Sequence, residues 1–98
     1  MGYYVMLTRV TEHGRKTLLA KPERIREVND EVERMGAKIE AQYFLLGEWD
    51  FINILSAPDD YTVARVSFEL GSRGTLETKT LPAFAIDGLI RYISAFKK

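Results

Sequence analysis

The sequence contains no cysteine and only one histidine, His13, among its 98 residues. The lack of cysteine excludes disulfide bonds, thiolate catalysis and cysteine-ligated metals, and it is typical of a small domain in a reducing compartment. A transition-metal site would need several carboxylates beside the histidine, and no group of Asp and Glu has the expected spacing. We therefore expect no metal and no other cofactor.

Long apolar runs and net charge are also missing. No stretch approaches the roughly 20 apolar residues that a membrane-spanning helix requires, and the first residues lack the basic and apolar regions of a signal peptide. Fourteen basic and fourteen acidic side chains cancel, whereas a dedicated nucleic-acid-binding domain usually carries a basic stripe. These absences predict a cytoplasmic protein that binds neither membranes nor nucleic acids.

The residues that are present have the composition of one globular domain over residues 1–98. Hydrophobic residues make up 46% of the chain and charged residues 29%, which is enough apolar material for one core and is not typical of disorder. The chain contains no linker, internal repeat or low-complexity segment. We expect a single folded unit.

A hairpin around Gly47 is the clearest local signal. It joins an apolar run that ends at residue 46 to a second run that begins at residue 51. Gly47 can adopt positive φ without strain, and Asp50 can accept hydrogen bonds from nearby backbone N–H groups and fix the turn. Pro58 ends the second run, and Asp59 or Asp60 then supplies a helix cap. The pattern predicts strand, turn, strand and helix.

The rest of the chain extends this pattern to a β-α-β-β-α-β order with a C-terminal helix. We expect a turn over residues 11–14, a short helical piece over 14–20, and helices from Pro22 to Gly36, up to Gly71, and from about Asp87. The second strand alternates apolar residues at positions 39, 41, 43 and 45. The expected strands cover residues 3–10, 37–46, 51–57 and 75–83. This order predicts an α+β, ferredoxin-like fold, with two helices on one face of a four-stranded sheet.

The third expected strand is apolar on both faces. Ile52 and Ile54 lie on one face, and Phe51, Asn53 and Leu55 lie on the other. Two helices cover only one face of such a sheet, so the other face needs cover from the final helix or from the sheet of a second copy. We favour a homodimer, or a higher homo-oligomer, because two-fold assembly is the commonest solution.

Several segments resemble the GYD domain proteins, a family named for a Gly-x-Tyr-Asp motif. The resemblance rests on the hairpin with Gly47-Glu48-Trp49-Asp50, on Ala57-Pro58-Asp59-Asp60, and on residues 11–14, 70–74 and 80–84. Trp49 replaces the tyrosine of the motif, so the aromatic ring is kept and the phenolic hydroxyl is lost. The resemblance implies a ferredoxin-like fold that pairs as a dimeric α+β barrel, and it implies no biochemical activity.

Glu48, Trp49 and Asp50 form the strongest cluster of candidate ligand-binding residues. The indole ring could form the wall of a ligand cavity while a carboxylate orients the ligand. Alternatively, these residues serve the turn and pack at the sheet edge or at a dimer interface.

Three further residues are candidates for the same ligand site. Phe44 lies on the strand that precedes the turn. Asn53 is a polar residue in an apolar strand, so its amide either bonds across the sheet or faces a cavity. His13 could act as a general base or as a single metal ligand, and the alternative is a solvated turn histidine.

Our leading hypothesis is a homo-oligomeric module that is not demonstrably an enzyme. In it, facing sheets enclose a small-molecule cavity lined by Phe44, Trp49 and Asn53. The first alternative is a small, cofactor-independent enzyme resembling a monooxygenase, with His13, Glu48 or Asp50 as acid and base. That alternative requires a deep, closed cavity with two converging titratable groups.

The second alternative is a structural or protein-interaction subunit. It would use the amphipathic final helix to dock on another protein. The helix carries apolar residues at helical spacing, namely Ile86, Leu89, Ile90 and Ile93. Packing of this stripe on the chain's own sheet would weaken the hypothesis.

Overall fold

Four antiparallel strands form one sheet in the order β2-β3-β1-β4. The computed structural model describes residues 2–97, and β1 lies at the centre of the sheet between β3 and β4. The α+β content and this strand order confirm the expected ferredoxin-like fold. The elements in chain order are β1 (Gly2–Val10), α1 (Glu12–Ala20), α2 (Arg24–Arg34), β2 (Lys38–Phe44), β3 (Phe51–Ala57), α3 (Asp60–Gly71), β4 (Leu76–Ala83) and α4 (Ile86–Ser94).

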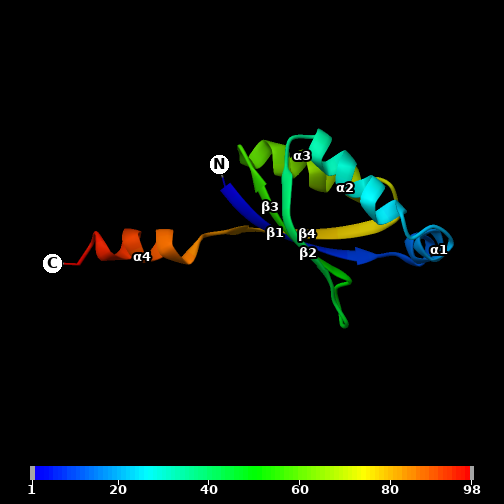
Figure 1. The fold of residues 1–98 in the computed structure, drawn as a ribbon, viewed down its shortest axis with the longest axis horizontal. Helices are drawn as coiled ribbons and strands as arrows, with labels where there is room; N and C mark the ends of the chain where they lie inside the picture. Colours follow the sequence, from blue (N-terminus) through cyan, green and yellow to red (C-terminus); the bar gives the residue numbers. More distant parts are fainter. Residues whose placement is uncertain (1, 98) are drawn as a thin grey trace.

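Helices α2 and α3 lie over the same face of the sheet, and α1 lies beside the end of β1 (Figure 1). Burial on this face follows the period of two that a strand imposes, because alternate β1 residues from Tyr4 to Val10 are buried. The core is therefore a single layer between sheet and helices. Its buried members are Tyr4, Met6, Val32, Ala37, Leu55, Ala57, Val63, Val66 and Leu70.

Two of the four described helices, α1 and α3, begin at a residue whose side chain caps them. Asp59 caps α3 by accepting the Thr62 N–H at 2.8 Å, and this bond lowers the pKa of Asp59. Helix α1 begins earlier than expected, because Thr11 caps it by accepting the Gly14 N–H at 3.1 Å. Residues 12–14 are therefore the first turn of a helix and not a free turn. Helix α2 begins at Arg24, two residues after Pro22.

Strand β2 contains a bulge that the sequence did not predict. Its register with β3 shifts between Ile39 and Ala41, so Glu40 is the extra residue. The expected alternation through positions 39, 41 and 43 is therefore wrong. Ile39 lies on the helix-covered face with Gln42, while Ala41 and Tyr43 lie on the opposite face.

The opposite face of the sheet, which we call the open face, is covered by no helix of the described chain. Its centre is apolar, with Val5 and Leu7 of β1 opposite Ile54 and Ile52 of β3. Helix α4 does not cross it but projects from the end of β4, away from the sheet and the other helices (Figure 1). This projection extends the molecule to 58 × 28 × 19 Å, and no described residue of α4 is buried. Within residues 2–97, no helix combines the length and apolar character needed to cross a membrane.

Candidate functional site

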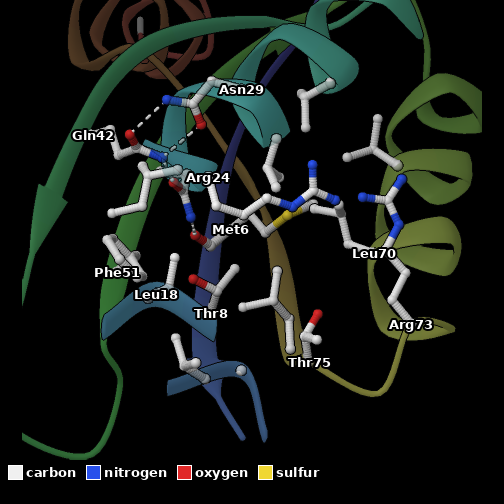
Figure 2. Close-up of a pocket in the computed structure, with 18 of the residues that line it drawn as sticks. Met6, Thr8, Leu18, Arg24, Asn29, Gln42, Phe51, Leu70, Arg73 and Thr75 are labelled. Atoms are coloured by element: carbon white, nitrogen blue, oxygen red, sulfur yellow. Dashed lines mark hydrogen bonds between the residues drawn. The ribbon is translucent and has the colours of Figure 1, made fainter. Parts of the chain in front are cut away.

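A cavity of about 180 Å³ lies between the helix-covered face of the sheet and helices α1 and α2. Met6, Thr8 and Asn53 line it from the sheet, and Leu18 and Val28 line it from α1 and α2. Figure 2 labels Met6, Thr8 and Leu18 among the lining residues. Most of the other lining side chains are aliphatic. The cavity is therefore an apolar hollow with a few fixed polar groups, which is the usual character of a small-molecule site.

Three side-chain amides form a hydrogen-bonded chain along one wall of this cavity (Figure 2). Asn29 and Gln42 exchange two bonds, with Asn29 Nδ2 donating to Gln42 Oε1 at 2.9 Å and Gln42 Nε2 donating to Asn29 Oδ1 at 3.0 Å. Gln42 Nε2 also donates to Asn53 Oδ1 at 2.8 Å, and Asn53 Nδ2 donates to the Met6 carbonyl at 2.8 Å. The buried Asn53 therefore both bonds across the sheet and faces the cavity.

Two arginines line the cavity at its α2 and α3 side. Arg73 binds Glu31 through two bonds of 3.1 and 2.9 Å, and Arg24 lies 3.5 Å from the same carboxylate. Arg24 also binds Glu27 at 3.1 Å. Hydrogen bonds from Lys21 and then from Arg24 lower the pKa of Glu27. Neither glutamate lines the cavity, so among the described lining residues the only charged side chains are the two arginines.

The β2–β3 turn carries a separate cluster around Arg9. The Arg9 guanidinium lies 4.5 Å from the centre of the Trp49 ring, which is the geometry of a cation–π contact. Arg9 Nε donates to the Glu48 carbonyl at 3.1 Å, and Arg9 Nη2 lies 3.3 Å from Glu48 Oε1. Arg9 points to the open face, opposite Glu77 of β4. The cluster therefore lies on the other side of the sheet from the cavity.

Asp50 fastens this turn to the central strand. Its backbone N–H donates to the Thr8 carbonyl at 2.9 Å, and its Oδ2 accepts the Val10 N–H at 2.7 Å. Its carbonyl accepts the Leu45 N–H at 2.7 Å and closes the hairpin. Gly47 has a φ of +151°, which favours glycine. The Asp50 carboxylate thus continues the β1–β3 hydrogen bonding beyond Phe51, the first residue of β3.

The family model described as GYD domain matches residues 4–93 of the chain. The chain belongs to the GYD domain family. Its Gly47-Glu48-Trp49-Asp50 turn is one of the segments on which the resemblance was based, and in this GYD domain the aspartate of the turn supports the sheet.

The chain is also similar to two individual proteins. This GYD domain is 45% identical over 91 residues to the "Glutamine synthetase and cystathionine beta-lyase binding protein" of Thermus thermophilus, covering 92% of this chain and 96% of the relative. It is similar in fold to the crystal structure of TTHA0845, also from Thermus thermophilus, with a TM-score of 0.57 and 18% identity, over 87% of this chain and 95% of the other. At that identity, the second comparison shows the fold alone.

The GYD domain does not bring the six candidate residues together. Only Asn53 lines the cavity. Glu48 and Trp49 lie with Arg9, Asp50 supports the turn, Phe44 is 63% exposed and packs edge-on against Phe51, and His13 is exposed on α1. A chamber lined jointly by Phe44, Trp49 and Asn53 is therefore not formed within one copy.

Seven polar residues line the cavity in addition to Asn53, and none of them was among the six candidates. Gln42 reaches the cavity because the bulge at Glu40 moves it to the helix-covered face, and no local sequence signal marks a bulge. The others come from β1, α1, α2 and the segment between α3 and β4, and they meet only in the folded chain. The seven are Thr8, Thr17, Arg24, Asn29, Gln42, Arg73 and Thr75.

A second, wider hollow of about 570 Å³ lies between α3 and β4. The Tyr4 hydroxyl donates a hydrogen bond to Asp60 there, and this bond raises the pKa of Tyr4. The buried Thr80 hydroxyl has no partner among the described residues. This hollow is open to the surface, so it is not a closed cavity.

Neither hollow meets the requirement that we set for an enzyme. The described lining of the smaller cavity includes no Asp, Glu, His, Lys or Tyr, and arginine stays protonated near neutral pH. Within residues 2–97, no group of three or more His, Asp and Glu could hold a metal ion. The geometry of the smaller cavity is suited to binding a ligand and offers no acid–base pair.

Proposed function

We propose that this GYD domain is a protein-interaction module that uses α4 to dock on a metabolic enzyme and its open face to pair with a second copy. The proposal rests on one observation, which is the exposed apolar stripe of α4. Side chains at i, i+3, i+4 and i+7 are 43–66% exposed in the isolated chain, and they are Ile86, Leu89, Ile90 and Ile93.

Helix α4 has a physical need for a partner surface. It is nine residues long, and helices shorter than about 12–15 residues are only marginally stable in water without packing. Because the stripe does not pack on the chain's own sheet, the condition that would have weakened the interaction hypothesis is not met. A groove on another protein would both cover the stripe and hold the helix, as in helix-in-groove recognition.

The relative from Thermus thermophilus suggests which kind of protein this partner is. That relative is named as a binding protein of glutamine synthetase and of cystathionine β-lyase. At 45% identity over nearly the whole chain, a shared mode of binding is the simplest inference. We therefore assign α4 a partner of that class, an enzyme of amino-acid metabolism.

The open face has the layout of an interface with a second copy. Its centre is apolar, and charged residues lie at its edge, with Arg9 3.8 Å from Glu77. An isologous sheet-to-sheet contact burying about 800 Å² per copy would be of ordinary size. The family resemblance implies the same pairing.

The test uses purified full-length protein and measures enzyme binding by α4 and self-association by the open face in separate experiments. Binding to glutamine synthetase and to cystathionine β-lyase from the source organism is measured by biolayer interferometry for wild type, for Ile90→Glu and for Arg91→Ala. Arg91 lies on the opposite side of α4 and is the matched control. We expect Ile90→Glu to weaken binding by about tenfold or more, since it places a charge in an apolar contact, and Arg91→Ala to bind like wild type.

Self-association is measured by light scattering coupled to size-exclusion chromatography. Leu81 lies on the open face, on edge strand β4, and is 43% exposed. We therefore expect Leu81→Glu to shift the dimer towards monomer. Enzyme binding by α4 should remain detectable in this variant. A monomeric wild type at micromolar concentration would refute the pairing. Failure to bind either enzyme, or equal binding by Ile90→Glu, would refute the docking role.

A further inference from the structure

The size of the cavity beneath α1 and α2 limits what it can hold. Its volume is about 180 Å³, and an apolar cavity of about 150 Å³ is large enough to bind benzene. A ligand with one ring, or with a short branched chain, and one small polar group therefore fits. Nucleotides and peptides do not.

The walls divide this cavity into an apolar part and a part rich in hydrogen-bond donors. Aliphatic side chains from α1, α2 and the sheet form the apolar part, including Val10, Leu18, Ile25, Val28 and Leu76. Such walls stabilise an apolar ligand body at roughly 25 cal/mol for each Å² removed from water.

The donor-rich part contains more N–H groups than acceptors. Gln42 uses both amide hydrogens, on Asn29 and on Asn53. Asn29 and Asn53 each donate one hydrogen to a described partner, which leaves each with a second N–H. The Thr8 hydroxyl lines the same cavity (Figure 2). An acceptor group on the ligand would satisfy these donors.

Charge favours an acceptor that is negative. Arg24 and Arg73 line the cavity, whereas the glutamates that they bind, Glu27 and Glu31, do not. Lys21 also binds Glu27, at 2.8 Å. Three cations thus share two carboxylates in this network, and one positive charge remains. Arginine binds carboxylates through two parallel hydrogen bonds.

We propose that the cavity is a binding site for a small carboxylate with an apolar body about the size of one benzene ring. The carboxylate lies against Arg24 and the amide chain, and the apolar body lies among the aliphatic side chains of α1 and α2. The site is on the helix-covered side of the sheet, whereas the proposed docking surfaces are the open face and α4. The inference goes beyond the proposed function and does not rest on it.

The experiment is an NMR titration of the ¹⁵N-labelled full-length protein with benzoate and, separately, with benzamide. Benzamide has the same shape without the negative charge. We expect benzoate to cause saturable shifts in the side-chain amide signals of Asn29, Gln42 and Asn53. We expect the affinity for benzamide to be lower by about tenfold or more, which is the scale of one hydrogen bond to a charged group. Non-saturating shifts, shifts confined to residues outside the cavity, or equal affinity for benzamide would overturn the proposal.

Matched variants identify the cation. Arg24→Gln is expected to weaken benzoate binding about tenfold or more. Arg26→Gln, on the same helix but 82% exposed and outside the cavity, is expected to leave it unchanged. If Arg24→Gln does not fold, Leu18→Trp provides a second test, since the indole would fill the cavity from α1 and abolish binding. Equal benzoate affinity of the two arginine variants, or undiminished binding by Leu18→Trp, would refute the assignment.

Discussion

Replacement of Asp50 by alanine tests whether the aspartate of the GYD motif acts through the sheet. The change keeps both backbone hydrogen bonds of residue 50, with the Thr8 carbonyl and the Leu45 N–H, and removes only the carboxylate. The Val10 N–H then loses its acceptor at 2.7 Å. Val10 is buried, with 4% of its surface exposed, so water replaces the lost acceptor poorly.

The expected cost follows from that single bond. A hydrogen bond to a charged group contributes about 1.5–3 kcal/mol. For a domain of this size, each kcal/mol lowers Tm by about 4–8 °C, so we expect Asp50→Ala to lower Tm by roughly 6–24 °C. Asp50→Asn keeps an oxygen acceptor, so its Tm should fall by about half as much as that of Asp50→Ala. The reason is that a hydrogen bond to a neutral acceptor is about half as strong as one to a carboxylate.

The assay is thermal and urea unfolding followed by far-UV circular dichroism, which reports on the whole chain and not only on the nearby tryptophan. The control is Glu48→Ala in the same turn. It removes an exposed ion pair with Arg9 and should cost less than about 1 kcal/mol. If Asp50→Ala unfolds at the wild-type temperature, or no lower than Glu48→Ala, the carboxylate does not support the sheet in the way the geometry indicates.

Three further predictions concern the described fold. Gly14→Ala would place a Cβ 2.3 Å from the Thr75 carbonyl oxygen, so Tm should fall even though alanine has a higher helix propensity than glycine. The control is Gly88→Ala, whose Cβ would have Arg91 Nη2 as its nearest neighbour at 3.9 Å, and it should not lower Tm. Gln42→Leu removes both hydrogen bonds of the Asn29 amide and the donor to Asn53 Oδ1, and it should cost about 1–3 kcal/mol in urea unfolding. A hydrogen bond from the Thr62 backbone N–H in α3 lowers the pKa of Asp59 in the folded state. The Asp59 carboxylate therefore stabilises the fold above its unfolded pKa of 3.8, and this stabilisation is lost as the pH falls through the lower pKa of the folded state. Melting curves of Asp59→Ala should therefore depend less on pH below 3.8 than those of wild type, and an unchanged pH dependence would contradict this account.

The parts of the fold that the sequence predicted are those with local causes. Strand β3 was predicted with its observed bounds, Phe51–Ala57, because Gly47 and Pro58 mark its two ends. The start of α3 after Asp59 follows from capping chemistry in the same way. The helix also ends at Gly71 as expected, although Gly71 keeps negative φ and the C-cap is Ser72. In each case a few neighbouring residues determine the backbone, so no knowledge of tertiary contacts is needed.

The candidate site was harder to predict because its causes are distant. The cavity depends on the bulge at Glu40, which decides the face on which Gln42 lies, and on where α1 rests against the sheet. The short Thr11-capped α1 was expected only in part, since residues 12–14 were assigned to a turn. Asn53 was recognised because a polar residue in an apolar strand is conspicuous, but its partners, Gln42 and the Met6 carbonyl, lie 11 and 47 residues away in sequence.

The central position of β1 allows its two faces to change independently during evolution. Side chains at positions 4, 6 and 8 point to the helices, and those at 5 and 7 point to the open face. A saturation mutagenesis scan along this strand should therefore give two interleaved sets of phenotypes, one in folding and ligand retention and the other in assembly. Selection on either set would leave the intervening positions free to vary, so a homologue could change its open face without altering the cavity on the helix-covered face.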